Sequence, residues 1–508
     1  MRTKDWILCI LSTILLILSF PKFNLWILAW FAFVPLFFAL RNKSKFKAFL
    51  LSYFAGIIFW LGTIYWLVHV TFVGLISLVL YLALYFGVFG FIIARYSILY
   101  TRYSIVLIPS IWVLLEYLRS YLFTGFGWGL LGYSQYLNLS AIQIADITGA
   151  WGISFLVMMI NVFAYGVMRY ALCAMRKKQK ALLSVTNYLL PAFILFLSLG
   201  YGFHELYMTH DAGGRRLTVS VIQGNIPQSI KWLDYAKEQI LERYLSLTSE
   251  ALSDNPDLII WPEAALPGVL NQDGHLKEKL KAFVGECGVP LLAGAVYSDK
   301  SAYYNSAILI SGNGEIAKRY DKLHLVPFGE YVPVKKIFGF LETVVPIGDF
   351  VPGKEYTVFS LDAKTGKTQD ARRFSVLICF EDIFPQISRG FVKKGADFLV
   401  NITNDAWFGD TSSPYQHLQA SVFRAVENGV YLVRAANTGI SGFISPYGEV
   451  RTLVDKDTGR QTFISGYKIY DIALGRRQNT FYTEWGDWFV LVCLIIAIYG
   501  VIKVKGKR

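Results

Sequence analysis

The chain has 508 residues, of which 54% are apolar, and its mean hydropathy is +0.43. This apolar content exceeds that of typical soluble domains, so the composition excludes a wholly soluble protein. The formal net charge of +13 could indicate a nucleic-acid partner, but the lysines and arginines flank apolar segments and form no single basic patch. We therefore expect a membrane protein without a nucleic-acid partner.

The apolar residues concentrate towards the two ends of the chain. They dominate before about Tyr201 and again after Trp485, and the stretch between them has the composition of a soluble domain. This distribution predicts a transmembrane domain over residues 1–203, a soluble domain over 204–484, and a transmembrane helix with a basic tail over 485–508.

Eight segments are long and apolar enough to be considered as spanning helices, since about 20 residues cross a bilayer and about 17 still suffice. They are residues 5–21, 24–40, 48–69, 72–94, 104–123, 152–172, 183–202 and 485–502. The first also resembles a signal peptide. No small-residue cleavage site follows it, and another apolar run comes at once, so we expect a retained helix.

Clusters of lysine and arginine orient these helices, because cytoplasmic loops are enriched in both residues. With a cytoplasmic N-terminus, the even-numbered helices end at basic clusters, which are residues 41–47, 95–103, 173–182 and 503–508. The opposite loops have few such residues; they are 21–23, 70–71 and 124–151. This alternation predicts that both termini are cytoplasmic and that the soluble domain faces away from the cytoplasm.

Two ionisable residues, Glu116 and Arg119, lie three positions apart in the predicted helix 104–123 and share one helical face. Charges within a membrane are costly and often functional. A structural ion pair, or side chains reaching towards the interface, explains them more simply, and we favour that interpretation.

The soluble stretch alternates predicted strands, recognised as β-branched apolar runs, with amphipathic helices. The strands are residues 217–226, 257–261, 289–297, 303–311, 374–380, 397–403 and 430–436. The helices are residues 234–253, 274–287 and 414–428. Strands that alternate with helices, followed by paired strands without them, indicate a layered α/β domain.

Three polar residues lie near the ends of apolar runs in this domain. Glu263 follows LIIWP, Lys322 lies in AKRYDKLHLVPFGEY, and Cys379 lies in FSVLICFED. A strand that ends in a reactive group presents that group from a rigid scaffold. Each residue alone has a simpler explanation, as a turn or helix cap, a solvated charge and a small buried hydrophobe, respectively.

Taken together, the strings around these residues resemble the nitrilase superfamily, and more narrowly the apolipoprotein N-acyltransferase family of bacterial lipoprotein maturation. The strings are WPE at 261–263, YDKLHLVPFGEYVP at 320–333, CFED at 379–382, NITNDAWFG at 401–409, RAVENGVYLVRAANTGIS at 424–441 and GFGWGLLGYSQ at 125–135. The resemblance covers most of the chain. It implies an αββα sandwich joined to a polytopic helical domain, in the bacterial inner membrane with the sandwich on the periplasmic side.

The resemblance also implies a Glu–Lys–Cys triad. Cys379 is the expected nucleophile, Glu263 the base that takes the thiol proton, and Lys322 the cation that stabilises an oxyanion. A thiol is only slightly ionised near neutral pH, so a nucleophilic cysteine needs a nearby base and a positive charge.

Three further residues are expected to support this triad. The backbone N–H of Phe380 is a second candidate oxyanion donor, and Glu330 is expected to orient Lys322. Glu381 points to the same side as Cys379 if the strand continues past the cysteine. The family likeness favours Glu330 over Glu381.

The implied reaction is a two-step acyl transfer. A phospholipid donates an acyl chain to Cys379 as a thioester, and the α-amine of a diacylglyceryl-modified apolipoprotein then accepts it. Trp232, Trp407 and Phe408 lie in loops near the predicted strand ends. They either cap a core or line an access path for lipid.

Two other functions remain open at this point. A membrane-anchored nitrilase-type amidase acting on a small amide would use the same triad, but it leaves seven preceding helices unexplained. A transporter or scaffold with an inactive nitrilase-like domain is the second, and the intact triad argues against it.

The sequence indicates no cofactor or metal, because its histidines lack zinc-type spacing and no glycine-rich phosphate loop occurs. Of five cysteines, only Cys287 and Cys379 lie in the soluble domain. A disulfide between them is the alternative to a free nucleophile.

Overall fold

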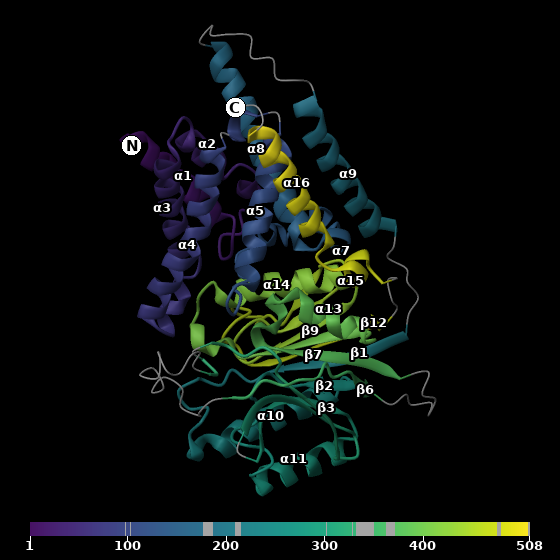
Figure 1. Cartoon of the computed structure of the whole chain (residues 1–508). Helices are drawn as coiled ribbons and strands as arrows, with labels where there is room; N and C mark the ends of the chain where they lie inside the picture. Colours follow the sequence, from purple (N-terminus) through teal and green to yellow (C-terminus); the bar gives the residue numbers. More distant parts are fainter. Residues whose placement is uncertain are drawn as a thin grey trace. The chain divides into compact units, whose positions relative to one another are not determined.

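The computed structural model describes residues 1–96, 98–101, 103–175, 186–208, 215–300, 302–327, 329–331, 350–361, 371–474 and 479–505. The chain forms two compact units (Figure 1). The membrane unit comprises Met1–His210, Thr411–Gln419 and Glu484–Arg508. The sandwich unit comprises Asp211–Asp410 and Ala420–Thr483.

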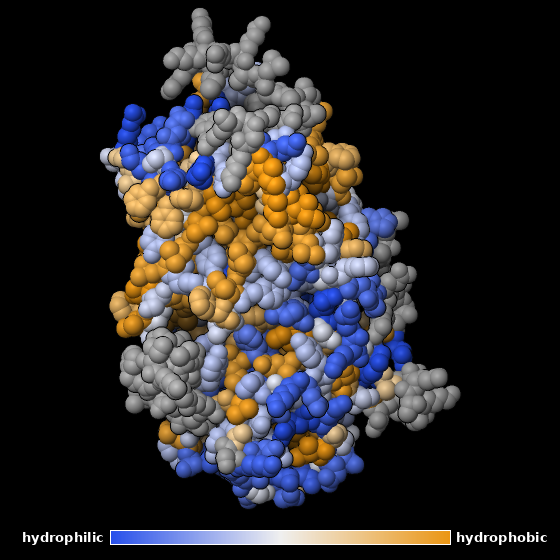
Figure 2. Space-filling model, in the orientation of Figure 1, coloured by the Kyte–Doolittle hydropathy of each residue, from blue (hydrophilic) through white to orange (hydrophobic). Residues whose placement is uncertain are grey.

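Within the described part of the chain, five helices of the membrane unit are long and apolar enough to cross a membrane. They are α3 (Lys45–Thr63), α4 (Phe72–Arg95), α5 (Ser104–Tyr121), α8 (Ala150–Met175) and α9 (Thr186–Met208). Figure 2 shows apolar side chains gathered on the surface of this unit. Exposed apolar residues on these helices include Phe72, Val73, Phe91, Val167, Phe193 and Phe196. These five helices confirm a helical membrane domain.

The predicted count of eight spanning helices is not confirmed. Three of the predicted segments fall short of that criterion; they form α1 (Thr3–Leu18), η1 (Trp26–Trp30) with α2 (Val34–Leu40), and α16 (Trp488–Lys505). The second segment is broken because Pro35 occupies the first turn of α2 and cannot lie inside a continuous helix without loss of a hydrogen bond. In the basic clusters at 173–182 and 503–508, residues 176–182 and 506–508 lie outside the described residues.

Glu116 and Arg119 of α5 are buried and hold the loop that follows their helix. Glu116 Oε1 accepts a hydrogen bond from the Leu131 N–H at 2.7 Å. Arg119 Nη1 donates to the carbonyls of Phe126 and Trp128 at 2.8 and 2.6 Å. These bonds satisfy buried backbone groups of the GFGWGLL segment, so the structure gives both residues a structural role.

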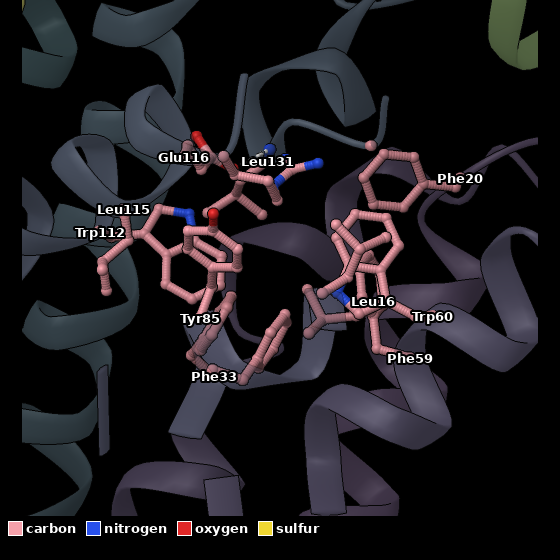
Figure 3. A pocket seen from close by; sticks show the side chains of 14 residues that line it. Leu16, Phe20, Phe33, Phe59, Trp60, Tyr85, Trp112, Leu115, Glu116 and Leu131 are labelled. Atoms are coloured by element: carbon pink, nitrogen blue, oxygen red, sulfur yellow. Dashed lines mark hydrogen bonds between the residues drawn. The ribbon is translucent and has the colours of Figure 1, made fainter. Parts of the chain in front are cut away.

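An aromatic pocket borders this pair (Figure 3). Glu116 and Leu131 lie at one end of the close-up, and Phe33 lies at the other. The cavity measures about 20 Å³, which is room for about one water molecule. It is therefore too small to hold a lipid headgroup.

The membrane unit also includes a segment that the predicted boundaries assigned to the soluble domain, Thr411–Gln419. This segment contains the first turns of α14 (Ser413–Asn428). Gln416 Oε1 accepts from Trp66 Nε1 at 3.1 Å, and Gln416 Nε2 donates to the Thr63 carbonyl at 2.8 Å. Buried polar pairs of this kind fix the segment to the end of α3.

Two six-stranded sheets form the sandwich unit. The first has the order β12 (Gly466–Leu474), β1 (Arg215–Gln223), β2 (Leu258–Ile260), β3 (Leu291–Asp299), β4 (Ala302–Ile310) and β5 (Ile316–Asp321). The second has the order β11 (Val450–Thr452), β10 (Gly442–Ile444), β9 (Tyr431–Ala436), β8 (Phe398–Thr403), β7 (Arg372–Ile378) and β6 (Phe359–Leu361).

Helices cover the outer faces of both sheets (Figure 1). On the first sheet, α10 (Lys237–Leu252) and α11 (Gly274–Cys287) bury an apolar stripe in one core; this core includes Ile240, Leu241, Leu280, Ile222, Ile259 and Leu291. The second sheet carries α13 (Pro385–Lys393) and the part of α14 from Ala420 onward. The predicted αββα sandwich is therefore confirmed.

The parallel strand pairs determine where the site forms. β1, β2 and β3 are parallel neighbours, as are β7, β8 and β9. The carboxyl ends of parallel strands meet at one edge of a sheet, and functional residues commonly follow them. Glu263 follows β2, Cys379 follows β7, and Asn404 follows β8.

The turn that carries Glu263 leaves little room on β3. A Cβ added at Gly294 would lie 2.4 Å from the Pro262 carbonyl oxygen and 2.6 Å from the Glu263 Cα. We expect Gly294→Ala to lower the free energy of unfolding by about 1–3 kcal/mol, because overpacking forces the backbone to shift. Thermal unfolding of the detergent-solubilised protein measures this. The control Gly274→Ala, in the first turn of α11 with no atom within 4 Å of the added Cβ, should unfold no earlier than wild type. Equal melting of the two variants would contradict the prediction.

Candidate active site

Glu263 lies directly beyond β2 at a tight turn in which Ala264 has a φ of +46°. Its carboxylate is mostly buried and hydrogen-bonded at both oxygens. Oε1 accepts from Asn305 Nδ2 at 2.8 Å, and Oε2 accepts from the Asn404 N–H at 2.9 Å. Asn305 lies on the first sheet and Asn404 follows a strand of the second, so residues from both sheets orient this carboxylate.

Lys322 follows β5, and only 1% of its surface is exposed. Its Nζ lies 2.9 Å from Glu330 Oε1 and 3.6 Å from Glu263 Oε1. Burial acts to lower the pKa of Lys322, but the carboxylates of Glu330 and Glu263 outweigh burial, so its pKa is raised. The ammonium therefore stays charged and cannot act as a base at neutral pH.

Glu330 lies beside Lys322. Its Oε1 also accepts a hydrogen bond from Asn305 Nδ2 at 2.7 Å, and its Oε2 accepts from the Val326 N–H at 2.7 Å. Asn305 thus donates to both carboxylates that flank the ammonium. Since each carboxylate oxygen of Glu330 has a donor, its position relative to Lys322 is fixed.

Cys379 is the first residue of the short helix η8 (Cys379–Ile383), immediately after β7. It adopts a φ of +54°, a left-handed conformation that costs a non-glycine residue about 1–2 kcal/mol. Asn401 Nδ2 donates to the Cys379 carbonyl at 2.8 Å and helps to hold this strained turn. The residue as a whole is half-buried.

The environment of Cys379 opposes spontaneous ionisation. Desolvation by the surrounding protein and the negative charge of Glu263 raise the pKa of the thiol, and the positive charge of Lys322 only partly offsets them. The thiol is therefore protonated at neutral pH. A base must remove its proton before it can act as a nucleophile.

The expectation for Glu381 is wrong in its premise, because the strand ends at Ile378 and the chain turns into η8. Glu381 is fully buried. Its Oε1 accepts from the N–H groups of Leu323 and His324 at 2.7 and 3.1 Å, and its Oε2 accepts from the Ile378 N–H at 2.7 Å. Glu381 therefore ties the segment after Lys322 to the end of β7.

Burial raises the pKa of Glu381 to about 7, while the hydrogen bond from Ile378 and the charge of Lys322 act in the opposite direction. Tyr320 also bonds to this carboxyl group, with its hydroxyl 2.9 Å from both oxygens. Phe380 follows the cysteine in the same turn, and Lys322 Nζ lies 5.2 Å from the centre of its ring. The oxyanion role of the Phe380 N–H stays a prediction.

Several residues of the site were missed by the sequence analysis. Asn305 and Asn401 lie inside strands, where asparagine is uncommon, and that anomaly was the available signal. Arg434 is fully buried and donates to Asn401 Oδ1 at 2.7 Å and to the carboxylates of Asp382 and Asp405 at 3.3 Å. Through Asn401, which donates to the Cys379 carbonyl, this network helps to hold the turn that contains the cysteine.

The three aromatic residues proposed for lipid access lie in loops or short helices. Trp407 and Phe408 belong to η9 (Asp405–Phe408), which follows Asn404 directly. Trp407 is 47% exposed, while Phe408 and Trp232 are partly buried. Their part in a lipid path stays a prediction.

Cys287 and Cys379 form no disulfide with each other, so that alternative is not formed. Within the described ranges, no group of three His, Cys, Asp or Glu side chains could hold a metal ion.

Comparison with known proteins identifies the family. Residues 12–163 match the apolipoprotein N-acyltransferase N-terminal domain, and residues 218–480 match the carbon-nitrogen hydrolase family. A curated apolipoprotein N-acyltransferase of Geobacter metallireducens is 40% identical over 97% of this chain and 93% of its own. The chain belongs to the apolipoprotein N-acyltransferase family. It is accordingly a membrane-bound acyltransferase with a nitrilase-type domain.

More distant proteins also match this N-acyltransferase. The apolipoprotein N-acyltransferase of Pasteurella multocida is 33% identical over 88% of this chain and 86% of its own. Among solved structures, an amidase of the nitrilase superfamily from Nesterenkonia AN1 is 20% identical and covers 54% of this chain and 98% of its own, with a TM-score of 0.39.

The hydrogen bonds of Glu381 predict a large cost for an apparently mild substitution. In Glu381→Gln, an amide group that donates hydrogen bonds would face the N–H groups of Leu323, His324 or Ile378. We expect a loss of about 2–4 kcal/mol in the free energy of unfolding, because buried donors are left unpaired. Thermal unfolding in detergent measures the loss. The exposed control Glu250→Gln should unfold with wild type, and an unchanged melting temperature for Glu381→Gln would refute the assignment.

Proposed function

We propose that Glu263, Lys322 and Cys379 carry an N-acyl transfer through a thioester on Cys379. The observation that supports this most strongly is the buried ammonium held between two carboxylates, Glu330 at 2.9 Å and Glu263 at 3.6 Å. Glu330 keeps Lys322 charged, which leaves Glu263 available to exchange a proton. The charges of Glu263 and Lys322 both act on the thiol.

The first half-reaction acylates the enzyme. Glu263 takes the proton from Cys379, and the sulfur attacks the ester carbonyl of a phospholipid acyl chain to form a C–S bond. Lys322 and the Phe380 N–H stabilise the oxyanion, with each such donor worth about 3–4 kcal/mol. The C–O bond then breaks, Glu263 returns the proton to the leaving oxygen, and a lysophospholipid departs.

The second half-reaction transfers the acyl chain to an amine. The α-amine of a diacylglyceryl-modified cysteine at the start of an apolipoprotein attacks the thioester carbonyl. Glu263 takes a proton from the attacking nitrogen, the C–S bond breaks, and the sulfur of Cys379 recovers a proton. An amide forms, and the enzyme returns to its starting state.

The names of the relatives and the apolar helices of the chain support lipid substrates. The family relatives are named for an apolipoprotein acceptor, and five long apolar helices accompany the sandwich unit. The basic clusters on alternate predicted loops support a sandwich unit on the periplasmic side of the bacterial inner membrane and cytoplasmic termini. Apolar surroundings and bound lipid would exclude water from the thioester.

The test reconstitutes the full reaction with a headgroup-labelled phospholipid and a synthetic diacylglyceryl-cysteine peptide. We expect N-acylated peptide and lysophospholipid in equal amounts. Glu263→Gln, which removes the base, should lower the rate by about 10²–10⁴-fold, and Cys379→Ala should abolish it. Cys287→Ala is the matched control, since this free thiol lies on a helix of the same unit, and it should keep wild-type activity. Ammonia release from small amides without peptide acylation would favour the amidase instead.

A further inference from the structure

A second buried lysine lies beside the triad. Lys231 belongs to the segment between β1 and α10, and only 2% of its surface is exposed. Its Nζ donates a hydrogen bond to the main-chain carbonyl of Glu263 at 3.1 Å. Burying an ammonium costs several kcal/mol unless partners compensate, so a lysine in this position needs a physical reason.

The segment that carries Lys231 contacts the Glu263 turn by a second route. Gln228 Oε1 accepts a hydrogen bond from Asn404 Nδ2 at 2.9 Å, and the Asn404 N–H in turn donates to Glu263 Oε2 at 2.9 Å. Lys231 fixes the main chain of Glu263, and Gln228 fixes the residue that holds its carboxylate. The segment therefore orients the carboxylate from both sides.

Lys231 adds a second positive charge beside the triad. Glu263 and Glu330 carry two negative charges, and Lys322 carries one positive charge between them. Among the described residues, the hydrogen bond of the Lys231 ammonium goes to a neutral carbonyl. Its positive charge therefore interacts with the negative charges of Glu263 and of an ionised Cys379 at longer range.

We propose that Lys231 is a positioning residue of the site, which holds the Glu263 turn and stabilises the negative charge that moves from Glu263 to the sulfur. This deepens the proposed function and rests on it. When Glu263 accepts the thiol proton, one negative charge leaves the carboxylate and develops on sulfur, and then on the oxyanion. Lys231 interacts with the first two of these positions, so its charge offsets the negative charge as the proton moves.

Burial lowers the pKa of Lys231 to about 8, against the opposing effects of Glu263 and Cys379. The ammonium is therefore mostly charged at neutral pH and becomes neutral as the pH rises through about 8. The stabilisation that it gives to the thiolate is present below that pH and is lost above it.

The test measures the reactivity of the Cys379 thiol without any lipid substrate. The full-length protein is treated with iodoacetamide, and the alkylated Cys379 peptide is quantified by mass spectrometry against time. In Lys231→Met, which removes the charge and keeps the length, we expect alkylation about tenfold slower at pH 7.5, because one unit of thiol pKa changes the thiolate fraction about tenfold. Lys237→Met, six residues further on at a more exposed ion pair, is the control and should react like wild type.

The pH profile separates a charge effect from a structural one. Lys231→Arg keeps the charge at all accessible pH values. Glu381 also titrates, near pH 7, and it does so in both proteins. In wild type the profile of alkylation rate should contain a further titration near pH 8 that is absent from Lys231→Arg. Profiles of the same shape would overturn the proposal even if Lys231→Met does not fold. A folded Lys231→Met with unchanged alkylation would also overturn it.

These outcomes are independent of the acyl-transfer reaction. Altered alkylation in Lys231→Met together with no acyl transfer by wild type would remove the proposed function and leave the electrostatic role of Lys231. Normal acyl transfer by wild type, together with unchanged alkylation in Lys231→Met, would leave the proposed function and remove the role of Lys231.

Discussion

The buried ammonium of Lys322 between Glu330 and Glu263 is the interaction on which the site depends. The carboxylates of Glu330 and Glu263 keep this lysine charged. The ammonium, Asn305 and the N–H groups of Asn404 and Val326 in turn compensate the burial of the two carboxylates. Removing one partner of such a buried pair typically costs about 3–5 kcal/mol, since the remaining charge is left uncompensated. The same interaction distinguishes the roles of Lys322 and Glu263. A lysine that is held charged can stabilise an anion but cannot accept a proton, so the base is Glu263 in this account.

The two sheets contribute different parts of this arrangement. The first sheet supplies Glu263 and Asn305, and the second supplies the turn that holds Cys379. The left-handed conformation of that cysteine is unfavourable by itself, and hydrogen bonds from Asn401 and to Glu381 hold the surrounding turn. The sandwich core thus offsets a strained turn that presents the sulfur beyond the end of β7.

The apolar runs of the sequence indicated a layered α/β domain and drew attention to Glu263, Lys322 and Cys379 near their ends. The resemblance to the nitrilase superfamily added the αββα sandwich and Glu330. The sequence did not predict Asn305 or Lys231, whose contacts depend on strands and turns distant in the chain. The short or partly exposed strands β5, β6, β10, β11 and β12 lack a long apolar run and were missed for that reason. The condition attached to Glu381, that the strand continues past the cysteine, is not met, and no residue pattern reveals a left-handed cysteine.

The central claim is that Cys379 carries the acyl chain between two lipid substrates. Intact-protein mass spectrometry after incubation with phospholipid, in the absence of an acceptor, tests it most directly. The account predicts that wild type gains the mass of one acyl chain, that hydroxylamine removes it, and that Cys379→Ala gains nothing. Wild type that remains unmodified, or a Cys379→Ala variant that is acylated to the same extent, would contradict it.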